Sequence, residues 1–192
     1  IAHYIYKLSG LPKNQVIGTG TAIDSARLQN MIAQTVNVDP RSVHAYSMGE
    51  HGDSQMVPWS TVTIAGKPFY DVIADNKELV GDVDLDELVY RTTQEGWEIF
   101  NRKGTTYYGI ATACVGVIKA ILNDENRIIP VSTLLEGEYG ERDVYAGVPT
   151  VLNRSGAYDV LEIHMTPGEL ARFKESTRVI REYTDRIMKL NL

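Results

Sequence analysis

A histidine between two glycines is the first candidate in the sequence for acid–base chemistry. In Gly49-Glu50-His51-Gly52-Asp53, acidic residues flank the imidazole on both sides. Histidine has an unperturbed pKa of about 6.5, so it can donate or accept a proton near neutral pH, and a neighbouring carboxylate changes that pKa. Glycines lack a Cβ and accept turn conformations. We therefore expect His51 to be exposed on a turn, where a reacting molecule can reach it.

A second stretch, Asp24-Ser25-Ala26-Arg27, places a carboxylate and a guanidinium three residues apart, and on a helix this spacing puts both on one face. Moving a hydride to or from a carbon that bears oxygen also requires a proton transfer on that oxygen, for which His51 is suited. Asp24 or Asp53 could bind the other ring nitrogen of His51 and favour its charged form. Arg27 offers the planar pair of donors that a carboxylate prefers.

Each of these groups also has a purely structural interpretation. The histidine could simply cap a turn, and the Asp24–Arg27 pair alone is a surface ion pair worth less than about 1 kcal/mol. Gly18-Thr19-Gly20 matches a dinucleotide-binding motif weakly, because Ile23 occupies the position of the third small residue. We interpret these glycines as a turn from a strand into a helix. Glu50-His51 lacks a second histidine at helical spacing, so we predict no metal site.

Hydrophobic spacing predicts the elements that must position these groups. A helix over 106–122 should be buried on most sides, because it is rich in Ala and β-branched residues and has Lys119 as its one charge. Asp84 should cap the helix before it. The expected elements up to this point are a short strand over 15–21, a helix over 24–36, a strand over 59–65, and helices over 85–102 and 106–122.

The remainder of the chain is typical of antiparallel strands followed by one long helix. Thr166-Pro167-Gly168-Glu169 supplies the cap, the first-turn proline and the third-position glutamate of a capping box. We find no repeats or linkers, and therefore predict one α+β domain over 1–192, with antiparallel strands packed against long helices. The strands are expected over 127–135, 144–153 and 159–163.

Composition limits the kinds of partner and compartment. The 192 residues carry a net charge of −6 with both signs interspersed, which argues against nucleic acid or an anionic membrane as the main partner. No apolar run approaches the roughly 20 residues of a membrane-spanning helix. A single cysteine, Cys114, favours a reducing cytoplasm. Because 1–12 reads as the second half of an apolar helix without an initiator Met, we expect the chain to be part of a longer protein.

The motifs together resemble a known family. Asp24-Ser25-Ala26-Arg27, followed at this spacing by 49–54 and Trp59-Ser60, resembles the catalytic half of the L-lactate and malate dehydrogenase superfamily. The resemblance extends over nearly the whole chain. The stretches that resemble bacterial L-lactate dehydrogenases of the lactic-acid type are 15–21, 103–109, 121–126, 138–140 and 147–149.

The resemblance implies a role for each candidate residue. His51 would give its proton to the carbonyl of pyruvate and take it back from (S)-lactate, and Asp24 would hold and charge that imidazole. Arg27 would bind the substrate carboxylate through two hydrogen bonds. Thr106 would line the pocket near the substrate side chain, and Thr19 would lie near the nicotinamide ring of the NAD cofactor.

The resemblance also implies a cytoplasmic homotetramer and a two-domain subunit. The dinucleotide-binding domain, a further catalytic arginine and the position that separates lactate from malate enzymes would all precede Ile1. Residues 1–192 would then be the C-terminal substrate-binding and catalytic domain. Two readings stay open besides a lactate dehydrogenase: a dehydrogenase of malate or of branched 2-hydroxy acids, and an interaction module that is inactive without its nucleotide-binding half.

His44 is a candidate for regulation. It occupies the place of a histidine that faces a second subunit in lactate dehydrogenases activated by fructose bisphosphate. Gln29 replaces the arginine that those enzymes use beside it, which predicts weak phosphate binding. The structural alternative is an exposed residue of an alternating strand.

We expect residues 1–192 alone neither to bind NADH appreciably nor to reduce pyruvate, because most of the cofactor site and one arginine would be missing. An NADH absorbance assay on the purified chain checks this. Measurable turnover would contradict it.

Overall fold

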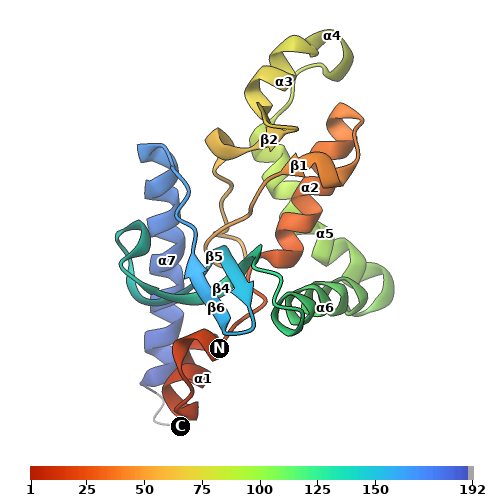
Figure 1. Ribbon diagram of the computed structural model, residues 1–192. Helices are drawn as coiled ribbons and strands as arrows, with labels where there is room; N and C mark the ends of the chain where they lie inside the picture. The colour runs from red at the N-terminus through yellow and green to blue at the C-terminus, as the bar shows by residue number, and fades with distance from the viewer. Residues whose placement is uncertain (190–192) are drawn as a thin grey trace.

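The computed structural model describes residues 1–189 and contains two antiparallel sheets among seven α-helices, which confirms the α+β prediction (Figure 1). The central sheet has the strand order β4-β5-β6, with β4 over Arg127–Glu136, β5 over Arg142–Asn153 and β6 over Gly156–Val160. A small sheet joins β1 (Val43–His44), β2 (Thr63–Ile64) and β3 (Lys67–Pro68). The helices are α1 (Ala2–Ser9), α2 (Ala22–Val36), α3 (Phe69–Asp75), α4 (Lys77–Val80), α5 (Leu85–Lys103), α6 (Tyr108–Leu122) and α7 (Pro167–Met188).

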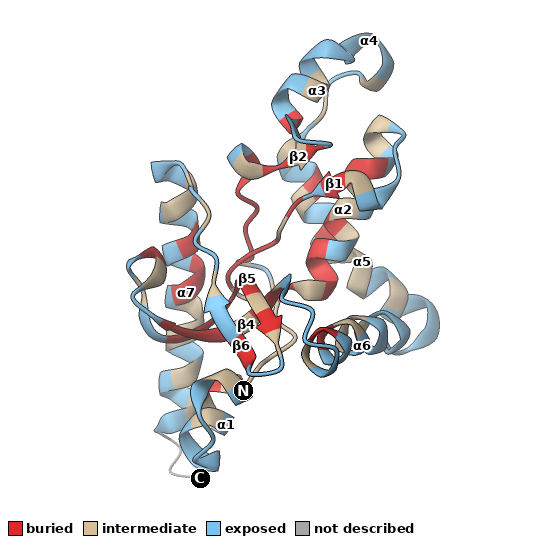
Figure 2. Cartoon of the chain, in the orientation of Figure 1, coloured by how far each residue is buried: buried red, intermediate tan, exposed pale blue. Residues whose placement is uncertain are grey.

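Most of β5 is buried because helices cover the central sheet on both faces, whereas Tyr158 and Asp159 of β6 are exposed (Figure 2). Alternate residues of β5 point to one face. Near the start of β5, Val144 and Val148 pack with Phe173 of α7, and near its end Leu152 packs with Val117 of α6. On the other face, Tyr145 packs against residues of α1. One strand thus connects α1, α6 and α7.

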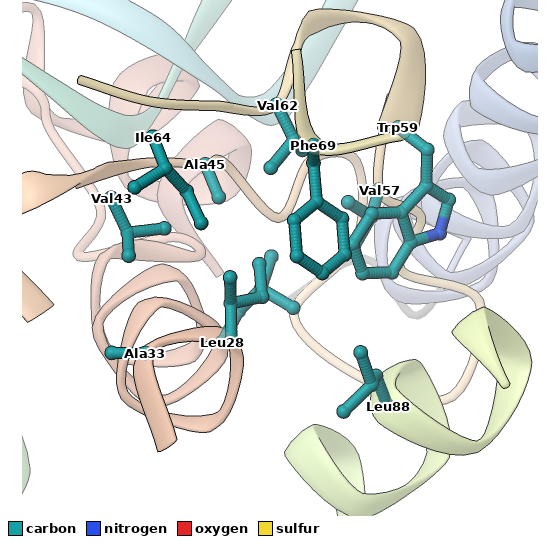
Figure 3. Close-up of a cluster of buried hydrophobic side chains, with 11 residues drawn as sticks. Leu28, Ala33, Val43, Ala45, Val57, Trp59, Val62, Ile64, Phe69 and Leu88 are labelled. Carbon is teal, nitrogen blue, oxygen red and sulfur yellow. The ribbon is translucent and has the colours of Figure 1, made fainter. Parts of the chain in front are cut away.

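Helix α2 lies against a second hydrophobic core. Its residues Leu28 and Ile32 are fully buried in a cluster with β1, β2 and α5, part of which appears in Figure 3. Trp59 and Phe69 stack in this cluster with their ring centroids 5.8 Å apart. Burial of this apolar stripe fixes the rotation of α2 and so determines where its polar residues point.

Of two predicted strands, one is wrong and the other is much shorter than predicted. Over 15–21, only Gly18 makes a bridge, to Ser132 of β4, and the chain then turns at Gly20, whose φ is 52°. A Cβ at Gly20 would lie 2.4 Å from the backbone nitrogen of Ser132, so this close approach needs glycine, and the predicted glycine turn is confirmed. Over 59–65, burial of Trp59 curls the chain into a 3-10 turn, and only Thr63–Ile64 forms a strand.

The predicted burial of the helix over 106–122 was also wrong. Within α6, only Val117 and Ala120 are buried. Ile110 and Ile121 are half-buried, whereas Tyr108, Val115, Ile118 and Leu122 are exposed. The composition of α6 correctly indicates an apolar helix. It does not indicate which element, if any, packs against that helix.

The other predicted elements are present, with shifted ends. Helix α2 begins at Ala22 rather than Asp24, and α6 begins at Tyr108, so Thr106 lies in the connection before it. Strand β6 begins directly after the turn, at Gly156 rather than Asp159. The capping box at Thr166 opens α7 as predicted. None of the helices over 1–189 is long and apolar enough to cross a membrane.

The loop after β1 is held to the sheet at Gly49, which exchanges two backbone hydrogen bonds with Gly147 of β5, at 2.9 and 2.8 Å. Gly49 has a φ of 91°, and a Cβ there would lie 2.3 Å from the Ser176 hydroxyl of α7. The reason for this glycine is therefore packing against α7, and not the access of a substrate to His51 that the sequence suggests.

We predict that Gly49→Ala lowers the free energy of unfolding by at least about 2 kcal/mol, because overpacking a buried site costs about 1–3 kcal/mol and positive φ adds about 1. Urea unfolding measures this loss. Gly66→Ala is the matched control: its φ is 83°, but nothing lies within 4 Å of the added Cβ. Equal losses in the two variants would rule out the contact with Ser176 as the cause.

Candidate active site

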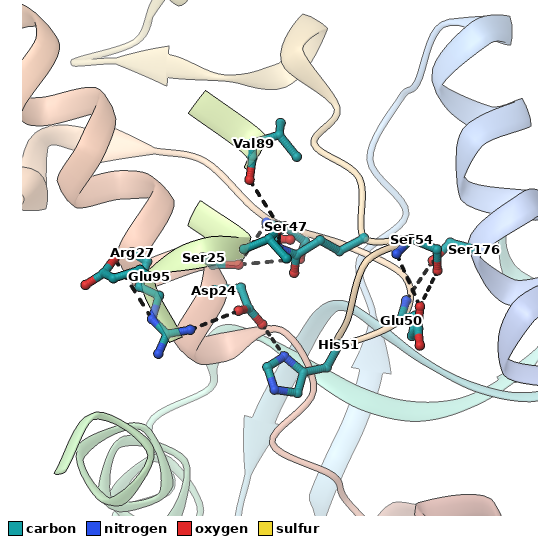
Figure 4. A network of polar contacts seen from close by, with 12 residues as sticks. Asp24, Ser25, Arg27, Ser47, Glu50, His51, Ser54, Val89, Glu95 and Ser176 are labelled. Carbon is teal, nitrogen blue, oxygen red and sulfur yellow. Dashed lines mark hydrogen bonds and ion pairs between the residues drawn. The ribbon is translucent and has the colours of Figure 1, made fainter. Parts of the chain in front are cut away.

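His51 lies at the tip of the loop, where it meets the first turn of α2 (Figure 4). Its Nδ1 is 2.5 Å from Oδ2 of Asp24, and 57% of its side chain is exposed. The predicted exposure of His51 is therefore confirmed. Asp24 is only 2% exposed, and its position in the first turn of a helix favours a negative charge. Of the two acids that the sequence leaves open, Asp24 is the partner of this ring.

The electrostatics favour a charged imidazole. The hydrogen bond with Asp24 raises the pKa of His51 above its usual value, although partial burial and the charge of Arg27 act in the opposite direction. The nearby charge of Glu50 also raises it. His51 can therefore hold a proton at neutral pH more readily than a free histidine does. Because Nδ1 faces Asp24, Nε2 is the nitrogen that can exchange a proton with a bound molecule.

Arg27 lies between two carboxylates. Its Nη1 is 3.5 Å from Oδ1 of Asp24, and its Nε is 4.0 Å from Oε2 of Glu95 on α5. Its side chain is only 12% exposed. A Cβ at Gly96 would lie 3.4 Å from Nη1, so the glycine gives the guanidinium room on the side of α5. Both ion pairs are long, which leaves donors of Arg27 free to bind a carboxylate with better geometry.

One cavity of about 650 Å³ brings most of the candidates together. Asp24, Arg27, His51 and Thr106 all line it, although they come from α2, from the loop after β1 and from the connection between α5 and α6. The rest of the wall is largely apolar and includes Ile23, Trp97, Phe100 and Ile110. The site therefore combines a proton donor, an anion-binding group and an apolar wall.

A second cavity, of about 500 Å³, borders the other side of His51. Thr19 lines this one and not the first. Its walls are mainly apolar side chains and the backbone around Gly18 and Gly20. Tyr145 also lines it, and burial raises the pKa of that phenol to about 12, so the hydroxyl stays protonated.

His44 is not part of either cavity. It lies exposed on β1, opposite Thr63. Gln29, the residue at the place of the expected arginine, donates instead to the backbone carbonyl of Ala45 at 2.9 Å. The regulatory role of His44 stays a prediction.

Glu95, Gly96 and Ser176 contact the site but were missed from the sequence. Glu95 and Gly96 face Arg27 only because α5 packs beside α2, and a charged residue on an amphipathic helix normally indicates a solvated face. Ser176 lies in the middle of α7, more than a hundred residues after the histidine loop. No spacing rule connects such positions, so the sequence offers no signal for them.

The sequence of this chain is similar to those of known proteins. Residues 21–190 match the family model described as the lactate/malate dehydrogenase, alpha/beta C-terminal domain. "L-lactate dehydrogenase 3" of Bacillus cereus is 50% identical over 183 residues, which are 95% of this chain and 58% of that protein. "L-lactate dehydrogenase 1" of Bifidobacterium longum is 46% identical over 188 residues, covering 98% of this chain and 60% of that protein. The chain thus spans less than two thirds of the length of these relatives.

A solved structure shows the same fold. The minor L-lactate dehydrogenase from Enterococcus mundtii, in its ligands-bound form, superposes with a TM-score of 0.92 at 39% identity. The superposition covers 97% of this chain and 59% of the other.

We predict that Asp24→Asn lowers the pKa of His51, because the hydrogen bond with the carboxylate is the main cause of its elevation. A group with a raised folded pKa stabilises the fold fully below its unfolded pKa of about 6.5, and this contribution is lost as pH rises through the folded pKa. The variant should therefore lose that part of the pH dependence of stability. Histidine NMR titration and urea unfolding at several pH values measure the two effects.

Asp53→Asn is the matched control for this titration, since Asp53 lines the same cavity without a hydrogen bond to the ring. An equal shift in both variants would show that general charge, and not the Asp24 contact, sets the pKa of His51.

Proposed function

The chain belongs to the lactate/malate dehydrogenase family, and we propose that it is the substrate-binding and catalytic domain of an NAD-dependent enzyme that interconverts (S)-lactate and pyruvate. The observation that supports this most is the meeting of His51, Asp24 and Arg27 in one cavity. Their chemistry matches what reduction of a 2-keto acid requires: a proton for the carbonyl oxygen and a cation for the carboxylate.

In this proposal the two ring nitrogens of His51 have different roles: Nδ1 binds Asp24, and Nε2 exchanges a proton with the substrate. Asp24 keeps Nδ1 protonated in both halves of the reaction and stabilises the imidazolium. In the reductive direction, Nε2 gives its proton to the oxygen of the carbonyl group, whose carbon gains the hydride. In the oxidative direction, Nε2 is left without a proton and accepts one from the alcohol.

Arg27 would orient the substrate. A carboxylate that binds its guanidinium through two hydrogen bonds replaces the long contacts to Asp24 and Glu95 with charge-assisted ones. It also places the 2-keto carbon within the cavity that His51 borders. Thr106 lies on the connection between α5 and α6 and lines this cavity, where it can contact the substrate side chain.

The second cavity is suited to part of the cofactor. NADH, when bound, supplies the hydride. A flat ring fits a space of about 500 Å³ with mainly apolar walls that reaches His51, and the hydroxyl of Thr19 can bond a polar group on its edge. The side chains around this cavity therefore fit a nicotinamide ring, and Thr19 is the residue that would hold it.

A dehydrogenase of branched 2-hydroxy acids is the second candidate. The substrate cavity is larger than pyruvate needs, and its apolar wall contains Trp97, Phe100 and Ile110. Such a wall can accommodate a longer apolar side chain.

We also propose that the enzyme assembles from several copies of its subunit. The exposed apolar side chains of α6, which include Tyr108, Ile118 and Leu122, form the kind of surface that marks a protein contact. Light scattering tests this part of the proposal.

Steady-state NADH assays on the complete protein with pyruvate, oxaloacetate and a branched 2-keto acid test the function. Arg27→Lys should lower kcat/KM for the preferred acid by about 10- to 100-fold, because it removes a charge-assisted bond worth about 1.5–3 kcal/mol. Arg172→Lys on α7 is the control, since Arg172 is exposed and lines neither cavity. No reduction of any of the three acids would refute the assignment.

A further inference from the structure

The loop that carries His51 is fastened to α7 by one serine. Ser176 is fully buried, and its Oγ accepts a hydrogen bond from the backbone N–H of Glu50 at 2.8 Å (Figure 4). The same Oγ lies 3.1 Å from Oγ of Ser54. Ser54 in turn donates a short hydrogen bond from its hydroxyl to the carboxylate of Glu50.

The directions of these three hydrogen bonds follow from the number of protons. A carboxylate accepts only, so the single hydroxyl proton of Ser54 belongs to the bond with Glu50. The bond between the two serines must then use the proton of Ser176. The result is a closed ring: the backbone of Glu50 donates to Ser176, Ser176 to Ser54, and Ser54 to the side chain of Glu50.

The fit around the ring is tight. A Cβ at Gly49 would lie 2.3 Å from Oγ of Ser176, and a Cβ at Gly52 would lie 2.8 Å from the Glu50 carboxylate. The two glycines that flank the histidine segment therefore let the loop close around Glu50 and approach α7. A loop held this closely has little freedom to shift relative to α7.

The position of His51 depends on this fastening. The imidazole is mostly exposed, and Asp24 is its one hydrogen-bond partner among residues 1–189. The charged groups that face it are Asp24 and Arg27 from α2, and Glu50 and Asp53 from its own loop. Because more than half of the side chain is exposed, the position of the imidazole beside Asp24 follows the position of the loop.

We propose that Ser176 is a positioning residue: through the hydroxyl ring with Glu50 and Ser54, α7 holds the loop so that His51 meets Asp24. Its relevance to catalysis rests on the proposed function, whereas its effect on the imidazole does not. Ser176 itself lines neither cavity, so it acts only through the loop.

The test compares Ser176→Ala, Ser54→Ala and Thr177→Ala in the complete protein. Thr177 is the matched control, because it is the adjacent buried hydroxyl of α7 but bonds only the helix carbonyl of Lys174, at 2.9 Å. Ser54→Ala breaks the same ring from a less buried position, so it decides the question if Ser176→Ala fails to fold. The histidine resonances are followed by NMR during a pH titration, and that of His51 is identified by its loss in His51→Gln.

In both Ser176→Ala and Ser54→Ala we expect the titration midpoint of His51 to fall by about half a pH unit or more, because the contact with Asp24 loosens. The Thr177 variant should match the unmodified protein. We expect kcat for the keto acid to fall about tenfold with little change in KM, since a positioned acid–base group contributes about 10²–10⁴ and Arg27 is untouched.

Two results would overturn the proposal. One is an unchanged His51 midpoint in folded Ser176→Ala or Ser54→Ala. The other is an equal shift in Thr177→Ala, which would indicate a general effect on α7. If the complete protein lacks dehydrogenase activity, the proposed function fails. The titration midpoints from NMR still decide whether Ser176 positions the imidazole of His51.

Discussion

The contact between His51 and Asp24 is the interaction on which the site depends. The two atoms are 2.5 Å apart, yet the residues come from elements that are fixed by different parts of the core. Asp24 is held by the apolar face of α2, which is buried against β1, β2 and α5. His51 is held through its loop by β5 and α7. The pKa of the imidazole therefore depends on how α2 is placed relative to β5 and α7.

The site contains one arginine, Arg27, that two carboxylates share. Arg27 is shared by Asp24 and Glu95 at distances too long for strong hydrogen bonds. Such a guanidinium is already in place for an anion, and it loses little when the anion displaces its present partners. Asp24 and Glu50 raise the pKa of the imidazole, which further prepares the cavity for a carboxylate that also needs a proton.

Close packing at two positions of the loop explains why its glycines are needed. The sequence suggested that glycine beside His51 gives a substrate access to the ring. In the structure, Gly49 is packed between β5 and α7, and Gly52 lies against the carboxylate of Glu50. The exposure of His51 follows from the tight turn behind it, because the base of the loop is bonded to β5 at Gly49 and to α7 at Glu50, and the tip borders the cavity.

The sequence alone determined the α+β class, most of the helices, the capping box of α7 and the identity of the chemical groups, because these depend on local spacing and residue type. It could not decide between Asp24 and Asp53 as the partner of His51, nor find Glu95 or Ser176, because these contacts join helices and a loop that are separated along the chain. It also expected α6 to be buried on most sides, although Tyr108, Val115, Ile118 and Leu122 are exposed. Spacing shows which residues share one helix or turn, whereas contacts between elements depend on how the whole apolar surface packs, and only the tertiary structure shows that.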